Sequence, residues 1–172
     1  LTAGCAAFMA ATFVFSAGFS KTAFADEADK TTLVYGSTDY TRINPAMDEH
    51  CEINVLLFDG LTDHDGDNQI IPRLAKSWEY DEENLTYTFH LEEGVKWHDG
   101  EPFTAEDVKF TFEAIMDPAN ESENAPDYED IESIEVIDEH TVAFHLSNVN
   151  TAFLEYMTKP VMPKHLLEGE DW

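Results

Sequence analysis

Polar and apolar residues alternate with a period of two in four short segments of the chain. This period is typical of a half-buried strand, because successive side chains of a strand point to opposite faces of its sheet. The segments are Trp78 to Tyr80, Tyr87 to Leu91, Ile134 to Val136 and Val142 to Leu146. Turn-forming residues join the first pair at Asp81 to Asn84 and the second pair at Asp138 to His140. The sequence therefore predicts two antiparallel hairpins.

Several independent signals predict a helix that begins after Phe103. Thr104 and Asp107 have the spacing of a capping box, with Asp in place of the usual Glu. Phe103 and Val108 occupy the two positions of a hydrophobic staple. The apolar stripe of the helix comprises Val108, Phe112 and Ile115. Pro118 ends the pattern, because proline cannot continue a helix.

The remaining segments are shorter. A β-rich run predicts a first strand at Thr31 to Tyr35, and Asp48 caps a predicted helix that runs to Phe58. A short helix is predicted at Thr151 to Met157. Turns and connections are predicted at Ser37 to Ala46, Asp63 to Asn68, Asp99 to Gly100, Asp117 to Asp130 and Pro160 to Leu167. We expect the acidic Asp117 to Asp130 segment to be exposed, and the chain to have an α+β fold with short antiparallel hairpins.

The first 25 residues differ in composition from the rest of the chain. Ala6 to Phe19 is almost wholly apolar, and no acidic residue precedes Asp26. The small residues Ala23 and Ala25 predict signal-peptide cleavage between Ala25 and Asp26. Residues 1–25 are thus expected to be a signal peptide, and the stretch is short for a membrane span. No Met and no basic region precede Leu1, so we expect the sequence to start inside its reading frame.

An alternative export signal begins at the N-terminus. Leu1 to Cys5 loosely resembles a lipobox, in which Cys5 would be acylated after cleavage. Lipoproteins usually continue with a polar tether, whereas Ala6 to Phe15 is apolar, so we favour cleavage after Ala25. Cys51 would then be the only cysteine, which excludes an intramolecular disulfide in this chain. Either signal indicates an exported protein.

The charge of the chain limits its partners. Its 172 residues include 36 Asp and Glu against 9 Lys and Arg, a formal net charge of -27. Such a surface repels phosphate backbones and anionic lipids, so we expect neither nucleic-acid binding nor electrostatic membrane adhesion. The acidity could attract cationic solutes. We interpret it instead as a solvated surface, because the charges are spread along the chain.

The candidate chemistry is sparse, and we expect no metal, no cofactor and no enzymatic activity. The seven histidines show no ligand-spaced pair. Asp63 to Asn68 resembles a calcium loop but lacks its full pattern and its later Glu, so we interpret it as a turn. No Gly-x-Ser-x-Gly elbow and no phosphate-binding glycine loop is present. Phe110 and Phe112 could stack on a ligand, but their helical spacing favours the hydrophobic core.

The order of the segments resembles family 5 of the bacterial extracellular solute-binding proteins. The resemblance rests on Ala75 to Glu79, Leu85 to Leu91, Glu93 to Gly100 and Phe103 to Val108, with flanking segments from Leu33 to Gly169 in one order. Glu92 departs from the Lys or Arg usual in the family. The family comprises oligopeptide-, dipeptide- and nickel-binding proteins of ABC importers. The resemblance implies the two-lobed, type II periplasmic-binding-protein α/β fold.

The resemblance also implies which part of that fold is present. Residues 26–172 would form the start of lobe I with its attached subdomain, and the second lobe would be absent. In such proteins the solute lies between the lobes. The loop after the first strand would face this cleft, which makes Ser37, Thr38, Asp39 and Tyr40 candidate ligand-binding residues. Asp39 could pair with a peptide amine or only order its own turn.

The implied function is the capture of a small solute, usually a peptide, for an ABC permease in the cytoplasmic membrane. We expect a monomer that is periplasmic or held at the cell surface. An alternative is a short secreted interaction or signalling module without a transport role. The alternative would follow if the reading frame ended at Trp172, because half a cleft cannot enclose a solute.

Overall fold

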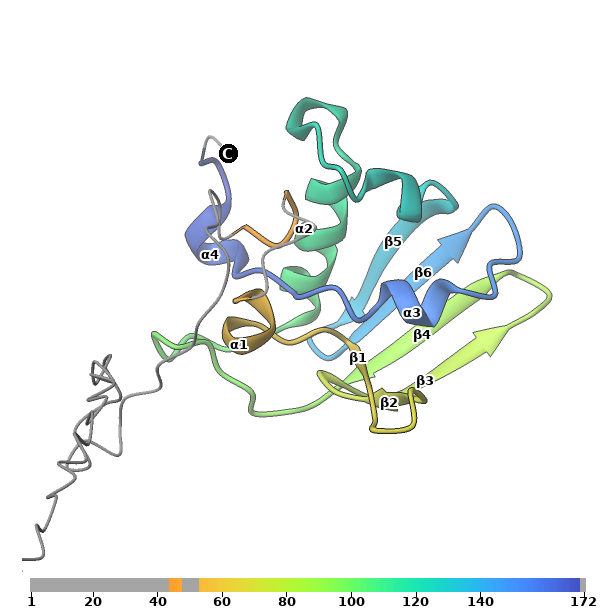
Figure 1. Cartoon of the computed structure of the whole chain (residues 1–172), viewed down its shortest axis with the longest axis horizontal. Helices are drawn as coiled ribbons and strands as arrows, with labels where there is room; N and C mark the ends of the chain where they lie inside the picture. Colours follow the sequence, from red (N-terminus) through yellow and green to blue (C-terminus); the bar gives the residue numbers. More distant parts are fainter. Residues whose placement is uncertain (1–43, 48–52, 171–172) are drawn as a thin grey trace, which may run out of the picture. The chain divides into compact units, whose positions relative to one another are not determined.

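A computed structural model of the chain describes residues 44–47 and 53–170. Helices are α1 (Asn54–Leu57), α2 (Ala105–Met116), α3 (Phe153–Tyr156) and α4 (Lys164–Leu167). Strands are β1 (Thr62–His64), β2 (Ile70–Pro72), β3 (Ala75–Asp81), β4 (Thr86–Leu91), β5 (Ile131–Asp138) and β6 (Thr141–Leu146), as labelled in Figure 1. Two 3-10 turns, Pro118–Asn120 and Ala125–Tyr128, separate α2 from β5. The predicted α+β class with short antiparallel hairpins is confirmed.

Strands β3, β4, β6 and β5 form one antiparallel sheet in that order. The side chains of β4 alternate, with Tyr87, Phe89 and Leu91 buried on one face. Tyr87 pairs with Phe144 of β6, and Phe89 pairs with Val142. Neighbouring strands thus present apolar side chains on the same face, where cross-strand pairs stabilise the sheet. Both predicted hairpins, β3–β4 and β5–β6, are confirmed.

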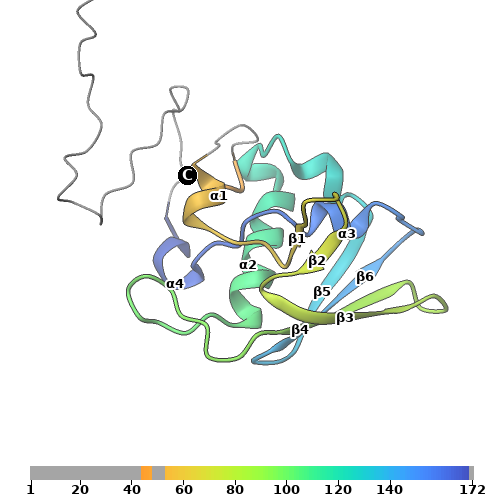
Figure 2. The same cartoon turned by 60° about the horizontal axis from the view of Figure 1, so that its bottom comes forward.

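Helix α2 packs against β5 and β6, as Figures 1 and 2 show. The predicted capping box forms at its start, where the Thr104 N–H donates to Asp107 Oδ2 over 2.9 Å. The predicted stripe residues Val108, Phe112 and Ile115 are all fully buried. The ring of Phe112 meets that of Phe144 edge to face, with centroids 5.2 Å apart. Phe110 is only partly buried at the margin of this core.

Helix α3 closes the same side of the sheet. Its residue Phe153 is almost completely buried and stacks on Tyr87 of β4, with ring centroids 4.7 Å apart. Phe153 also lies edge-on to Phe144, at 5.6 Å. Aromatic side chains from β4, β6, α2 and α3 therefore form one continuous core.

The helix predicted from Asp48 to Phe58 is shorter in the structure. Asp48 lies outside the described residues, and α1 ends at Leu57 because Phe58 is extended. The chain then runs beside the segment after α3, where Leu61 N–H donates to Met157 C=O over 2.9 Å. Gly60 permits this approach, since a Cβ there would lie 2.5 Å from the Thr158 carbonyl oxygen.

The expectation that Asp117 to Asp130 is exposed was wrong for three of its residues. Ser122, Asn124 and Tyr128 are all buried within this connection. The two polar side chains bond to the backbone of Ala46, and Tyr128 packs edge-on against Phe112 with ring centroids 5.2 Å apart. The connection is therefore anchored, although its acidic residues remain at the surface.

Several predicted features lie outside the described residues. They include the signal peptide of residues 1–25 with its cleavage site at Ala25 and Asp26, the strand Thr31 to Tyr35, and Cys51. Within residues 44–47 and 53–170, no helix combines the length and apolar character needed to cross a membrane.

Candidate ligand-binding site

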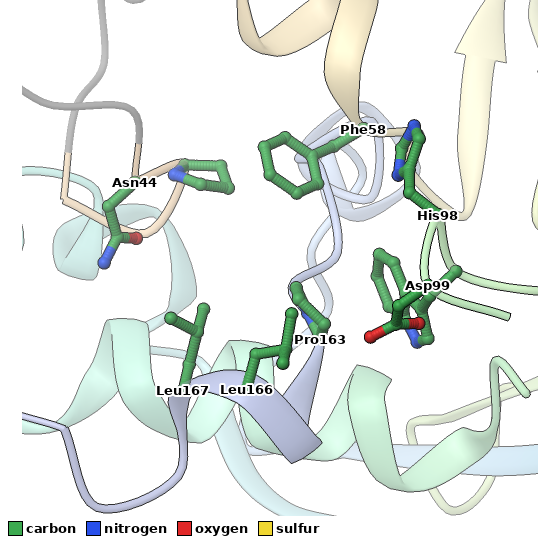
Figure 3. Close-up of a pocket in the computed structure, with 9 residues that line it drawn as sticks. Asn44, Phe58, His98, Asp99, Pro163, Leu166 and Leu167 are labelled. Carbon is green, nitrogen blue, oxygen red and sulfur yellow. The ribbon is translucent and has the colours of Figure 1, made fainter. Parts of the chain in front are cut away.

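An apolar groove lies between the end of α1, the turn at Trp97 to Gly100, and α4 (Figure 3). We call it the α1–α4 groove. It encloses about 370 Å³ and is lined by Asn44, Pro45, Phe58, Trp97, His98, Asp99, Pro163, Leu166 and Leu167. In Figure 3, Leu166 and Leu167 point from α4 into the space between Asn44 and Phe58.

Backbone hydrogen bonds fix the turn that forms one wall of the groove. The Trp97 N–H donates to the Glu101 carbonyl over 2.8 Å, and the Gly100 N–H donates to the Trp97 carbonyl over 2.9 Å. Gly100 has a φ of 97°, a conformation that favours glycine. The Asp99–Gly100 turn predicted from the sequence is therefore confirmed.

Two buried groups of α2 position the segment that leads into α4. Asp107 Oδ1 accepts a hydrogen bond of 2.9 Å from the Lys164 N–H, while its other oxygen caps α2. The Thr111 hydroxyl donates to the Asp107 carbonyl and accepts from the Met162 N–H. The wall formed by α4 is thus attached to the core helix through side chains that are themselves buried.

An ion pair joins the two walls of the groove. His165 Nε2 lies 2.7 Å from Asp99 Oδ2. The hydrogen bond to Asp99 raises the pKa of His165, and the negative charges of Asp99, Asp107 and Glu101 add to this effect. The same bond lowers the pKa of Asp99. Both side chains are partly exposed, so the pair is screened by solvent.

A second concavity, whose lining includes several polar and charged side chains, lies between the Ala125–Tyr128 turn and the segment after α3. We call it the Asn124–Lys159 concavity. It encloses about 320 Å³ and is lined by Asn124, Asp127, Tyr128, Glu155, Tyr156, Thr158, Lys159 and Pro160. The Lys159 ammonium donates to Asn124 Oδ1 over 2.7 Å. This site holds a cation, an amide and carboxylates in a small volume.

The Asn124–Lys159 concavity is tied to the end of the predicted cleft loop. The Ser122 hydroxyl and the Asn124 amide both donate to the Ala46 carbonyl. Asn44 Oδ1 accepts from the Ala46 N–H over 2.9 Å, which closes a local turn. Residues 44–46 are the end of the loop predicted at Ser37 to Ala46. The described end of this loop is therefore held in place by Asn124 of the concavity and by the neighbouring Ser122.

Residues 69–170 match the family described as bacterial extracellular solute-binding proteins, family 5 Middle. The chain belongs to this family. The matched region spans more than half of the chain and contains the sheet, α2 and both walls contributed by α4 and the Trp97 turn.

Individual relatives agree with the family 5 assignment. The chain is 37% identical over 122 residues to di/tripeptide-binding protein 1 of Pseudomonas aeruginosa, covering 60% of this chain and 23% of that protein. The NikZ protein of Campylobacter jejuni, solved with Ni(L-His), is 41% identical with a TM-score of 0.74, covering 77% of this chain and 27% of NikZ. OppA of Haemophilus influenzae, solved with the peptide RPPGFSPFR, is 28% identical with a TM-score of 0.68, covering 76% and 30%.

The comparisons also define what part of the family 5 fold is described. The chain spans about a fifth of the length of the curated relatives that it matches. Its structure is an α+β part of the type II periplasmic-binding-protein fold. Members of the family are transport binding proteins of the periplasm or cell exterior rather than enzymes.

The candidate residues Ser37, Thr38, Asp39 and Tyr40 lie outside the described residues, so their role stays a prediction. Sequence reasoning missed Ser122, Asn124 and Lys159. The sequence offered one signal for such a site, which is that Lys159 is a basic residue in a chain with few of them. The bonds from Ser122 and Asn124 to Ala46 span more than 70 residues and leave no local pattern.

The acidic turn predicted at Asp63 to Asn68 is a tighter turn at Asp65 to Asn68, because Asp63 and His64 belong to β1. Asp65 Oδ1 accepts from the N–H groups of Asp67 and Gln69, both at 2.9 Å. This carboxylate oxygen therefore stabilises the turn itself. In the part of the chain that the structure describes, no three His, Cys, Asp or Glu residues gather in a way that could hold a metal ion.

Proposed function

We propose that this chain is the first part of lobe I in the solute-binding component of an ABC importer. The complete protein captures peptides or similar small solutes and delivers them to a permease in the cytoplasmic membrane. The observation that carries the proposal is the family 5 match over residues 69–170, together with the di/tripeptide-binding relative.

The polar groups of the Asn124–Lys159 concavity support a peptide-like solute. A peptide presents amines, amides and carboxylates, and binding sites hold such groups with a few well-placed polar side chains. Lys159 supplies a cation, and the buried Asn124 holds it beside residues 44–47 through bonds to Lys159 and to Ala46. Asp39 would pair with a solute amine, and Tyr40 would offer an aromatic face.

The same proposal includes the protein's location and assembly. Residues 1–25 direct export and are removed between Ala25 and Asp26, which leaves a mature protein in the periplasm or at the cell surface. The protein acts as a monomer and binds no nucleic acid, because its net charge of -27 repels phosphate backbones.

The genomic DNA on both sides of this segment provides the first test. We expect the frame to continue through a second lobe, with permease and ATPase genes alongside. A stop codon after Trp172 in an intact genome would contradict the transport function and favour a secreted interaction module.

Calorimetric titration of the complete protein with a di- and tripeptide library provides the second test. We expect binding by the complete protein and none of submicromolar affinity by the 172-residue chain, because affinity depends on closure between two lobes. Asp39→Ala, Tyr40→Ala and Lys159→Ala should weaken binding. Lys76→Ala is the matched control, since Lys76 lies on β3 and pairs with the exposed Glu93. Unchanged affinity in the first three variants would refute these site assignments.

A further inference from the structure

The turn that joins β3 to β4 contains a sequence that solute transport does not explain. Asn84, Leu85 and Thr86 form the pattern Asn-x-Thr, in which the middle residue is not proline. In exported proteins this pattern is the acceptor for N-linked glycosylation. Glu82 lies two positions before the asparagine and supplies the acidic residue that bacterial oligosaccharyltransferases select. The motif therefore indicates a modification site at the tip of this hairpin.

The motif lies where an enzyme can reach it. Asp81 pairs with Thr86 at the end of the β3–β4 ladder, so residues 82–85 form the turn itself. The turn projects from the end of the sheet, away from α2, in both Figures 1 and 2. Glu82 and Asn84 are both exposed. Exposed loop tips are the places at which processing enzymes most readily reach a folded chain.

The side chain of Asn84 is oriented at this tip without being enclosed. Its Nδ2 donates to Asp81 Oδ2 over 2.7 Å, and its backbone N–H donates to Asp81 Oδ1 over 3.2 Å. An asparagine amide nitrogen carries two hydrogens, so the bond to Asp81 uses one of them. Glycosylation replaces a single hydrogen, and the one that remains can keep the bond to Asp81. The turn is therefore compatible with a modified side chain.

Thr86 supplies the hydroxyl that the motif requires. Its Oγ1 donates to the Asn84 carbonyl over 3.0 Å and lies 3.0 Å from His145 Nδ1 of β6. Thr86 is only partly buried, so its hydroxyl belongs to the same accessible turn as the acceptor amide. Serine at this position would keep a hydroxyl, whereas valine would keep the branched shape and remove it.

A second copy of the pattern, Asn120-Glu121-Ser122, provides an internal comparison. The Asn120 amide donates to a backbone carbonyl of α2 over 2.8 Å, and the Ser122 side chain is buried. Pro118 stands two positions before this asparagine, where the first copy has an acidic residue. A transferase cannot bind a hydroxyl that the fold encloses, so we expect this copy to stay unmodified.

We propose that Asn84 is a site of N-linked glycosylation on the exported protein. The amide Nδ2 forms a bond to C1 of an oligosaccharide, and the bond from C1 to the oxygen of its polyprenyl pyrophosphate carrier breaks. The carrier leaves with the electron pair, and the amide loses one proton to a base of the membrane-bound oligosaccharyltransferase. The inference rests on the export that belongs to the proposed function, because the lipid-linked sugar is presented outside the cytoplasm.

Glycosylation in vitro tests the site on the folded chain. The purified chain is incubated with a bacterial oligosaccharyltransferase and a polyprenyl-pyrophosphate oligosaccharide, then digested and analysed by mass spectrometry. We expect the oligosaccharide mass on the peptide that contains Asn84 and not on the peptide that contains Asn120. Asn84→Gln should abolish the modification. Asn120→Gln is the matched control and should leave it unchanged.

Two substitutions of Thr86 separate the chemistry from the fold. Thr86→Ser should retain the modification at a lower yield, whereas Thr86→Val should abolish it, and circular dichroism melting shows whether each variant is folded. Undiminished modification of folded Thr86→Val would contradict the proposal. A synthetic peptide of residues 79–90 is the substrate control. Modification of this peptide but not of the folded chain would show that the hairpin protects Asn84, and would overturn the proposal.

Mass spectrometry of the protein isolated from cells that encode it is the second test. We expect the oligosaccharide on Asn84 in the cell-envelope fraction, and bare Asn84 in that fraction would overturn the modification. Peptide binding is measured separately on the same material. An exported, unmodified protein that binds peptides refutes only the glycosylation, whereas a glycosylated protein that binds no peptide refutes only the transport function.

Discussion

The described part of the molecule has two apolar clusters, the core between α2 and the sheet and the α1–α4 groove. Their side chains are similar in kind but differ in how much of their surface is exposed. Phe112 and Phe144 of the core have no exposed surface, because α2, α3 and the sheet enclose them. Leu57 and Leu166 beside the groove keep more than a third of their surface exposed. The described part therefore completes one apolar cluster by itself and leaves a second one open. A self-sufficient core and an open side are what a subdomain of a larger lobe requires.

Truncation in the two regions should give the largest contrast in stability. Phe144→Ala should lower the free energy of unfolding by about 3–5 kcal/mol, because it opens a cavity among packed aromatic rings. Leu166→Ala in the same 172-residue chain should change it by less than about 0.5 kcal/mol, because the side chain is already largely in water. Urea denaturation followed by circular dichroism measures both. Similar losses in the two variants would show that the groove is closed in this chain.

A smaller effect is expected where the core holds the α4 wall. Asp107→Asn should lower the free energy of unfolding by about 1–2 kcal/mol, because an amide nitrogen cannot accept one of the two backbone bonds from Thr104 and Lys164. Glu106→Gln is the same change one residue earlier, in an exposed pair with Lys164 Nζ. That control should cost less than about 1 kcal/mol. Denaturation curves that rank the two variants in reverse would contradict the role of Asp107.

The smallest effect should be a pH dependence of the stability that the His165–Asp99 ion pair contributes across the groove walls. The pKa of folded His165 lies above its ordinary 6.5, so its stabilising effect is complete below pH 6.5 and is lost as the pH rises through the folded pKa. The pKa of folded Asp99 lies below its ordinary 3.8, so its effect is present above pH 3.8 and is lost as the pH falls through the folded pKa. The pair therefore stabilises the fold most between about pH 4 and 6.5.

Thermal melting of the unsubstituted chain and of His165→Gln measures this dependence. The difference in Tm should be larger at pH 5.5 than at pH 8.5, and Asp99→Asn should reproduce the profile. A difference that is constant across this range would show that His165 contributes no charge to the pair.

The sequence predicted most accurately the parts of the fold whose signals are local. The β3–β4 and β5–β6 hairpins follow from alternation and turn residues that lie within a few positions of one another. The start of α2 follows from Thr104 and Asp107, which are three residues apart. In each case the same short segment carries both the pattern and the contacts that it predicts.

The features that the sequence did not reveal depend on distant partners. The burial of Ser122 and Asn124 reflects their bonds to Ala46, and Gly60 lies close to the backbone of the distant Thr158. The second carboxylate oxygen of Asp107 likewise accepts a hydrogen bond from the N–H of Lys164, which is 57 residues away. Local propensities cannot predict such distant pairs. The expectation of a binding cleft came instead from the family resemblance. Its candidate residues Ser37 to Tyr40 remain a prediction.

The strand order β3-β4-β6-β5 leaves β3 and β5 as the two edges of the sheet. Both edges are irregular, with register shifts between Ala75 and Ser77 and between Ile131 and Ser133. Exposed carboxylates also line them, including Glu79 and Glu135. A strand from another molecule therefore meets a bent, negatively charged edge instead of a flat row of free N–H and C=O groups. Edges of this kind protect a protein against intermolecular β-aggregation.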